Sequence, residues 1–338
     1  MWSEILTCAA SGGVVAFAGT ILARQADRIG ALSGLGRLRV GALLLAGATS
    51  LPEITTDVAA ARLGAVDLAA GDTIGSSMAN MLILAIIDLL PPRDVLRRAT
   101  VDNTLVACLA ITLNTMAAIF ITSPIRIQIG RVSLGSILIV LVYVLGIRVV
   151  LRHATGASQE PVAPEPAVAP EAARPAQRRV LLGRALAGFG VASLLILVAG
   201  PVFARSAANL SRELGIAETF VGTLLVGVTT SLPELSASLA AARFGAFDLA
   251  VANLFGSNAF NMVIFFAMDL ASPTPIFGAV STAHVMTVLF ANLMMTIGIA
   301  AIVLRSSGRR LALAEPSSAA MVFTYVVGLW FLWQRVKS

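Results

Sequence analysis

Long apolar runs separated by short polar segments make up most of the chain. A helix that crosses the hydrocarbon core of a bilayer needs about 20 predominantly apolar residues, and ten segments provide such a run. They cover residues 4–23, 38–62, 67–90, 101–121, 130–151, 180–203, 219–243, 248–270, 280–304 and 314–334. The pattern predicts an all-α polytopic membrane protein with ten transmembrane helices. Because the first run has no basic region before it and no cleavage site, we expect a retained helix rather than a signal peptide.

Part of this pattern occurs twice. Residues 40–90 align with residues 221–271 without a gap, and 25 of the 51 paired positions are identical. The identities include Pro, Glu, Asn and Gly, beyond the Ala and Leu that two apolar segments share by chance. Self-similarity of this kind marks a repeated structural unit, and an offset of 181 residues relates each position to its counterpart.

One polar segment differs from all the others. Residues 154–178 are rich in Ala, Pro and Glu and have no apolar periodicity, which is typical of an extended, semi-rigid linker. The segment divides the ten predicted helices into five and five. We therefore expect a first five-helix repeat at residues 1–153, the linker at 154–178, and a second five-helix repeat at 179–338. Because five is odd, the second repeat should be inverted in the membrane, as in secondary transporters whose sites form where two repeats meet.

Composition agrees with a membrane protein, and charge predicts its orientation. Hydrophobic residues make up 57% of the chain and charged residues 12%, against about 25% charged in soluble domains. If the N-terminus lies outside, 17 of the 24 basic residues fall on the cytoplasmic side and 7 outside. The positive-inside rule then predicts both termini outside and a cytoplasmic linker, in a bacterial-type plasma (inner) membrane. We expect no nucleic-acid partner and, for Cys8 and Cys108, small buried side chains rather than disulfides.

The first repeated motif is TSLPE, at residues 49–53 and 230–234. A proline within a membrane helix frees carbonyl oxygens about one turn earlier, and these must face protein or a wet cavity. Two such prolines at equivalent places predict a discontinuous helix in each repeat. Carbonyl, hydroxyl and carboxylate oxygens together suit a hard cation such as Ca²⁺ or Na⁺. The motif supplies the side-chain oxygens of Thr49, Ser50, Glu53, Thr230, Ser231 and Glu234.

The second repeated motif adds amide groups. In GSSMAN, Ser76 and Asn80 are four residues apart and share one helix face, and Ser257 and Asn261 do the same in GSNAFN. A charge at the bilayer centre costs about 2.5–3.5 kcal/mol on insertion scales, and the two glutamates would repel each other. A bound cation offsets both effects, so we predict a metal site of two Glu, two Asn and several Ser or Thr oxygens.

Other acidic residues leave alternatives open. Asp57 lies one turn beyond Glu53, and it either lines the ion path, binds a proton, caps a helix or pairs with Arg62. Asp72 lies one turn before its Gly-Ser motif, and it either lines the ion path or pairs at a helix end. We expect N-caps at Asp67 and Asp248, and solvation at the membrane interface for Asp88 and Asp269.

The two motifs resemble the α-repeats of the calcium/cation antiporter superfamily, which includes the sodium/calcium exchangers. Those repeats read G-x-T/S-S-x-P-E followed by G-S-N-x-x-N/D, and the matches here are GATSLPE (47–53), GSSMAN (75–80), TTSLPE (229–234) and GSNAFN (256–261). The resemblance implies four central ion sites, with Glu53 and Glu234 as main carboxylate ligands and Asn80 and Asn261 at the amide positions. The implied remaining ligands are the hydroxyls of Thr49, Ser50, Ser76, Thr230, Ser231 and Ser257, and carbonyls near Ala46–Ala48 and Gly227–Thr229.

The resemblance further implies a secondary antiporter, not an enzyme, that exchanges Ca²⁺ for Na⁺ by alternating access. We expect no cofactor besides the transported ions and no obligatory protein partner. Departures from the family pattern at Ser77, Asp72 and Asn261 keep Ca²⁺/H⁺ exchange open as an alternative. A remote alternative, an intramembrane aspartyl protease, rests on Asp72, although residues 69–72 read AAGD rather than GxGD. In the family the first and sixth helices slide past the core, here on Gly12, Gly13, Gly19, Gly183, Gly188 and Gly190.

Overall fold

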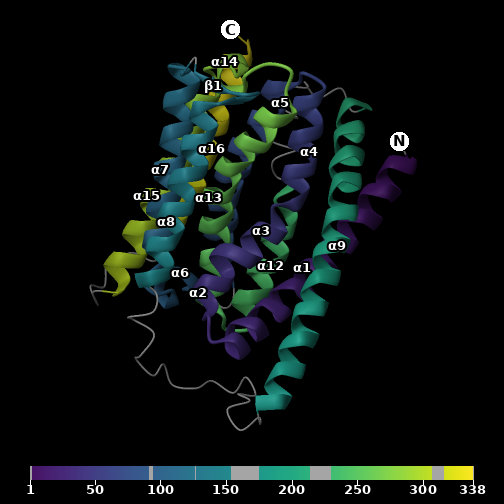
Figure 1. The fold of residues 1–338 in the computed structure, drawn as a ribbon, viewed down its shortest axis with the longest axis vertical. Helices are drawn as coiled ribbons and strands as arrows, with labels where there is room; N and C mark the ends of the chain where they lie inside the picture. The colour runs from purple at the N-terminus through teal and green to yellow at the C-terminus, as the bar shows by residue number, and fades with distance from the viewer. Residues whose placement is uncertain are drawn as a thin grey trace.

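The computed structural model describes residues 2–90, 94–125, 127–153, 175–213, 230–306 and 316–337, which are almost entirely helical (Figure 1). Seven of the described helices are long and apolar enough to cross a membrane. They are α1 (Trp2–Ser33), α5 (Val66–Leu89), α7 (Asn103–Thr122), α8 (Leu134–His153), α9 (Pro175–Glu213), α13 (Phe247–Ala271) and α15 (His284–Ser306). A shorter apolar stretch lies in α16 (Pro316–Lys337). A helical membrane protein is therefore confirmed, whereas the described residues do not by themselves reach ten spanning helices.

The second predicted helix is broken, as its proline indicates. It consists of α2 (Arg37–Arg39), the π-helix η1 (Val40–Leu45), α3 (Ala46–Thr49) and α4 (Leu51–Arg62). The backbone leaves the helical region at Ser50 (φ −82°, ψ 8°), so Pro52 lies in the first turn of α4, where a missing N–H leaves no bond unmade. The same break recurs at Ser231 (φ −80°, ψ 6°) before α12 (Leu232–Arg243). Residues 219–229, the start of the seventh predicted helix, lie outside the described part of the chain.

In the described part of the chain, the ends of four helices differ from the predicted ones by four residues or more, and the ninth predicted helix begins at His284 rather than at residue 280. The first helix continues to Ser33 because its later residues keep a buried face. The sixth begins at Pro175, a residue type that favours the first helical turn, whereas linker residues 154–174 lie outside the described part. The fifth begins only at Leu134, because Gly130 (φ 66°) first turns strand β1 (Gln128–Ile129) back onto β2 (Val132–Ser133). Two short helices complete the described elements, α6 (Val95–Arg98) and α14 (Ile276–Ala279).

The central helix of each half packs against the last two helices of the other half. α5 contacts α15 and α16, and α13 contacts α7 and α8. At the start of α5, Asp67 accepts a hydrogen bond from the Ser281 N–H (2.6 Å); at the start of α13, Asp248 accepts one from the Thr100 N–H (2.7 Å). Because Ser281 follows α13 and Thr100 follows α5, each helix begins near the point where the other ends. α5 and α13 therefore run antiparallel.

Two local predictions are wrong. The N-cap residues of α5 and α13 are Ala65 and Ala246, because the expected capping carboxylates lie inside the first turn and bind donors from the opposite half. The burial expected for both cysteines also fails. Cys8 is half-buried, Cys108 is exposed on α7, and both are free thiols.

The expected solvation of Asp88 and Asp269 is wrong as well. Both side chains are fully buried. Asp88 accepts a hydrogen bond from the Leu96 N–H (2.8 Å), and Asp269 accepts one from the Ile276 N–H (2.8 Å). The chain after each helix folds back and supplies the donor that a buried carboxylate requires. These two residues therefore stabilise the turns that follow α5 and α13 rather than face solvent.

α1 and α9 lie against each other on one side of the molecule (Figure 1). α1 also packs on α12, and α9 packs on α4, so each long helix contacts the broken helix of the other half. Gly19 and Gly200 are counterparts at these contacts. A Cβ on Gly19 would lie 2.6 Å from Ser236 Cβ, and one on Gly200 would lie 2.6 Å from Pro52 Cγ. Open space surrounds three other glycines that we expected to smooth the packing, Gly13, Gly183 and Gly190.

Figure 1 shows both termini toward the upper end of the molecule, while the ends of α8 and α9 that flank the linker lie toward the lower end. α4 runs from the break at Ser50 toward the upper end, and α12 lies in the lower half. The two broken helices thus extend in opposite directions from the middle of the molecule.

Candidate cation-binding site

The two helix breaks place one carboxylate each in the interior. Glu53 lies in the first turn of α4 and Glu234 in the first turn of α12, and both side chains have no exposed surface. Their carboxylates are close enough to interact electrostatically. Glu234 Oε1 accepts hydrogen bonds from Ser50 (3.2 Å) and Ser257 (3.3 Å). Among the described residues, Glu234 Oε2 and both oxygens of Glu53 have no donor, a costly arrangement unless a positive charge lies between them.

The threonine of each TSLPE motif reaches the Gly-Ser motif of the other half. The Thr49 hydroxyl lies 3.5 Å from Ser257 Oγ. The Thr230 hydroxyl lies 3.2 Å from Ser76 Oγ and donates to Asp72 Oδ1 at 2.8 Å. These paired contacts bring four of the predicted hydroxyl residues, Thr49, Ser76, Thr230 and Ser257, to the crossing of the broken helices with α5 and α13.

A close backbone approach at Gly256 makes one of these crossings. A Cβ at this position would lie 2.8 Å from Ala42 Cα and Ala42 O in η1. Only glycine therefore allows α13 to cross η1 at this distance. The next residue of α13 is Ser257, which the crossing holds against Glu234 and Thr49.

An amide chain orients one of the two predicted asparagines. Asn258 donates from Nδ2 to the Ser77 carbonyl (3.1 Å), which can only accept, so its Oδ1 must face Asn80. Asn80 therefore donates from Nδ2 to that oxygen (2.9 Å). Asn80 Oδ1 is left as a fully buried acceptor without a donor among the described residues, and neither side-chain polar atom of Asn261 has a partner there.

Asn258 is a site neighbour that the sequence-based prediction omitted. It is the third residue of GSNAFN, and its counterpart in the first repeat is Ser77, so the duplication that singled out the other residues did not mark it. The usable signal was a third buried amide one residue after Ser257 on a helix already predicted to carry ligands.

Asp57 and Asp72 lie next to this shell. Asp57 Oδ2 accepts a hydrogen bond from Thr73 (2.6 Å) and its carboxyl lies within hydrogen-bonding reach of the Asp72 carboxyl. Asp72 Oδ1 accepts from Thr230. Asp57 thus lies on a buried face rather than at a helix cap, and Asp72 lies among site residues rather than in a helix-end pair. The pair is a direct neighbour of the predicted ligands.

The donor set consists of oxygen ligands. Among the described residues, no group of three or more His, Cys, Asp or Glu side chains is arranged to hold a metal ion. Carboxylate, amide and hydroxyl oxygens instead gather around Glu53 and Glu234, a mixture that suits Ca²⁺ or Na⁺ better than a transition metal. The carbonyls expected near residues 227–229 lie outside the described part of the chain.

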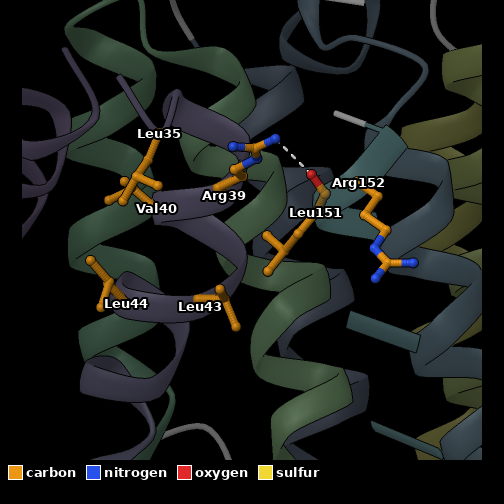
Figure 2. A pocket seen from close by; sticks show the side chains of 7 residues that line it. All are labelled: Leu35, Arg39, Val40, Leu43, Leu44, Leu151 and Arg152. Atoms are coloured by element: carbon orange, nitrogen blue, oxygen red, sulfur yellow. Dashed lines mark hydrogen bonds between the residues drawn. The ribbon is translucent and has the colours of Figure 1, made fainter. Parts of the chain in front are cut away.

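The site is closed in this conformation. The described ligand candidates Thr49, Ser50, Glu53, Ser76, Asn80, Thr230, Ser231, Glu234, Ser257 and Asn261 are all at most 1% exposed. A cavity of about 400 Å³ lies elsewhere, between η1 and the end of α8 (Figure 2). There Arg39 donates to the Leu151 carbonyl (2.6 Å), and leucine side chains form most of the lining. None of the ligand candidates lines this cavity, so an ion could exchange at the site only after a change of conformation.

Comparisons with known proteins agree with this geometry. A model of the sodium/calcium exchanger protein family matches residues 3–152 and again residues 184–334. The inner membrane protein YrbG of Escherichia coli is 29% identical over 254 residues, which cover 73% of this chain and 71% of that protein. The sodium/calcium exchanger MaX1 of Methanosarcina acetivorans is 33% identical over 113 residues, 33% of this chain and 31% of that one. A solved structure of the sodium-calcium exchanger NCX_Mj has the same fold, with a TM-score of 0.68, 18% identity, and 97% and 99% of the two chains covered.

Proposed function

The chain belongs to the sodium/calcium exchanger protein family, and from that premise we propose that it exchanges Ca²⁺ for Na⁺ across a membrane by alternating access. The family consists of transporters, so the chain is not an enzyme and the protease alternative is set aside. Cation antiport follows from the family; the choice of Na⁺ as the coupling ion is the proposal.

One observation carries this proposal. Glu53 and Glu234 are fully buried and interact with each other, and three of their four carboxylate oxygens have no donor among the described residues. Two carboxylates hold two negative charges, which either one Ca²⁺ or two Na⁺ neutralise. Because both cations need the same oxygens, binding of one excludes the other. That exclusion couples the two ion movements.

Amide and hydroxyl oxygens complete the proposed ligand set. The proposed ligands besides the two glutamates are Asn80, Asn261, Thr49, Ser50, Ser76, Thr230, Ser231 and Ser257. Ca²⁺ takes about six to eight oxygen ligands, so carbonyls freed by the two helix breaks would contribute as well. Support comes from burial of all eight side chains and from the unpaired acceptor on Asn80.

We further propose the architecture that this mechanism needs: ten transmembrane helices as two inverted five-helix repeats, residues 1–153 and 179–338, joined by a linker at 154–178. The antiparallel α5 and α13 support it, as do the two successive family matches. The excess of basic residues on the linker side supports both termini outside and a cytoplasmic linker. The name of the E. coli relative supports a bacterial inner membrane.

Ca²⁺/H⁺ exchange is the second candidate, and one observation favours it. Beside the two central glutamates stand two further buried carboxyl groups, Asp57 and Asp72, while the second amide position carries Asn261 rather than an acid. Four protonatable groups and no third central carboxylate suit a proton-coupled exchanger. The two candidates differ in which gradient drives Ca²⁺ movement.

Proteoliposomes test both candidates. Vesicles loaded with Na⁺ are diluted into Na⁺-free buffer containing ⁴⁵Ca²⁺, with equal pH on both sides and a protonophore present. We expect uptake that requires internal Na⁺ and that disappears in E53Q and E234Q. E4Q, which removes a carboxylate on α1 away from the site, serves as the matched control and should retain uptake.

Gel filtration and circular dichroism establish that each variant is folded. Uptake at the wild-type rate in folded E53Q or E234Q would contradict the central assignment. Uptake that ignores internal Na⁺ but follows an imposed proton gradient would favour the second candidate instead.

A further inference from the structure

The two halves differ at one pair of buried positions beside the central glutamates. In the first half, Asp57 on α4 faces Asp72 on α5. In the second half, their counterparts are Ser238 on α12 and Asn253 on α13, which form a neutral hydrogen bond (Asn253 Nδ2 to Ser238 Oγ, 2.9 Å). All four side chains are at most 1% exposed. The backbone is the same in both halves, but only the first half places two carboxyl groups together.

Hydroxyl groups surround the acidic pair. Thr73 donates to Asp57 Oδ2 (2.6 Å), Thr230 donates to Asp72 Oδ1 (2.8 Å), and Ser76 donates to the same oxygen (3.4 Å). Five buried side chains thus turn oxygen atoms toward one small volume. They come from α4, from α5 and from the break before α12, so three separate elements meet there.

The charges of this pair are not balanced by neighbouring side chains. Asp57 Oδ1 and Asp72 Oδ2 have no donor among the described residues. Among the described residues, a further titratable group close to the pair is the Glu53 carboxyl, which adds negative charge when it is ionised. The ion pairs formed by described residues, Arg37 with Asp27 and His284 with Asp67, involve other carboxylates. Two adjacent carboxyl groups in a dry interior need a positive charge to compensate them, either a shared proton or a bound cation.

We propose that Asp57 and Asp72, with the hydroxyls of Thr73, Ser76 and Thr230, hold a Ca²⁺ ion at a position separate from the Glu53–Glu234 centre. Two carboxylates balance the charge of one divalent ion, and their four oxygens with three hydroxyls fall within the usual coordination number of about six to eight. The choice of Ca²⁺ as occupant rests on the proposed function; the existence of the acidic pair does not.

The acidic pair lies toward one end of the molecule, so this site is on one side of the centre. Asp57 lies one turn beyond Glu53, about 6 Å further along α4, toward the end of the molecule where both termini lie (Figure 1). The neutral Ser238–Asn253 pair occupies the equivalent place toward the opposite end. A cation approaching from the side of the termini therefore meets a binding position before the centre, and one from the other side does not. Thr230 and Ser76 contact each other and Asp72, and because both are also proposed ligands of the centre, they can pass the ion between the two positions.

Equilibrium binding of ⁴⁵Ca²⁺ to the purified full-length protein in Na⁺-free buffer tests this site. The variant D57S/D72N replaces the acidic pair with the residue types that the second half has at these positions. The variant E53Q/E234Q removes the central charges. We expect two Ca²⁺ per chain in the wild type, one in D57S/D72N and one in E53Q/E234Q. S238A changes the counterpart of Asp57 and should still bind two.

Three outcomes overturn the proposal. Equal stoichiometry in the wild type and D57S/D72N, with affinities within about twofold, means that the acidic pair shares a proton rather than a Ca²⁺ ion. Loss of all binding in folded D57S/D72N means that these acids serve the central ion. Two bound ions in both single variants D57N and D72N mean that the carboxylates are not ligands. If E53Q/E234Q binds as many ions as the wild type, the proposed function fails and the site at Asp57 and Asp72 does not.

Gel filtration and the thermal unfolding midpoint exclude misfolding of each variant. The single variants D57N and D72N preserve side-chain volume, so they replace the double variant if it does not fold. In that case loss of one bound ion in either single variant supports the site.

Discussion

Glu234 and Glu53 occupy equivalent places in the two halves, and their surroundings differ. Around Glu234, the hydroxyls of Ser50 and Ser257 both donate to one carboxylate oxygen. Around Glu53 the corresponding bonds are missing: Ser231 Oγ has no partner among the described residues, and neither Glu53 oxygen has a donor there. The first glutamate therefore depends more on a bound cation than the second does.

The donors differ because of one position on the central helices. It carries an acid in the first half, Asp72 on α5, and an amide in the second half, Asn253 on α13. Asp72 can only accept, and as a carboxylate it is the stronger acceptor, so it draws in the hydroxyls of Ser76 and Thr230. Asn253 donates to Ser238, and its Oδ1 accepts only a long hydrogen bond from Thr49 (3.4 Å) among the described residues. Ser257, the counterpart of Ser76, then donates to Glu234. A single change from amide to acid is enough to redistribute the donors of a pseudo-symmetric site.

The largest expected difference between the halves follows from removing each glutamate charge. Both E53Q and E234Q should abolish exchange. In cation-free buffer, however, E53Q should raise the free energy of unfolding by about 1–3 kcal/mol, because it removes a buried carboxylate with no donor. E234Q should raise it less, since the Glu234 carboxylate already accepts two hydrogen bonds.

Thermal unfolding of the purified proteins measures this difference. Added Ca²⁺ should raise the midpoint of the wild type and of E4Q more than that of either glutamine variant, which keeps only the ion proposed at Asp57 and Asp72. A lower midpoint for E53Q than for E234Q in cation-free buffer would show that the donors are not distributed as the structure has them.

Residue type and repetition together predicted the parts of the site that depend on local sequence. A proline after Thr-Ser-Leu breaks a helix wherever it occurs, so both breaks were predictable from TSLPE alone. The burial of Glu53, Glu234, Asn80 and Asn261 followed from their occurrence in apolar runs.

The sequence could not supply features that depend on how distant segments meet. Asp88 lies at a helix end, where solvation is the natural expectation, and only the returning chain at Leu96 makes it a buried acceptor. Asp248 caps nothing because Thr100, in the other half, offers a better donor. The neighbour role of Asn258 depends on the Ser77 carbonyl across the α5–α13 crossing. Contacts with the returning chain or between the halves decided each of these, and the sequence pattern of the helix itself does not encode them.

The next largest effect concerns the counterparts Gly19 and Gly200, where α1 and α9 contact the broken helices. A leucine at either position would overlap Ser236 or Pro52, and overpacking of this kind costs about 1–3 kcal/mol. We expect G19L and G200L each to slow exchange by at least about tenfold, because the added side chains would block the sliding of α1 and α9 that we expect alternating access to need. Initial rates of ⁴⁵Ca²⁺ uptake per folded molecule measure the effect.

G13L is the matched control, since a side chain there meets open space. It should transport at about the wild-type rate. A slow G13L, or a G19L as fast as the wild type, would show that these glycines do not mark the moving contacts.

A smaller effect should follow from the amide chain that only one half possesses. N258A removes the acceptor that orients Asn80, and loss of such a supporting contact typically weakens metal binding about 10–100-fold. S77A should change the affinity less than about twofold, because within the described part of the chain the Ser77 hydroxyl bonds only the Thr73 carbonyl of its own helix. Calcium titrations of both variants measure the difference. Equal affinities in N258A and the wild type would mean that Asn80 needs no support.

The smallest expected difference concerns stability alone. Asp248 accepts three hydrogen bonds from Thr100 and Asn103 at 2.7–3.0 Å, whereas its counterpart Asp67 is 57% exposed, accepts one hydrogen bond from the Ser281 N–H at 2.6 Å and lies 3.3 Å from His284 Nε2. D248A should therefore lower the free energy of unfolding by about 2–3 kcal/mol, and D67A by about 1 kcal/mol or less. Thermal unfolding compares the two, and exchange per folded molecule should stay unchanged in both. An equal loss in D67A would mean that the contact between α5 and the segment before α15 stabilises the fold as much as the Asp248 contact does.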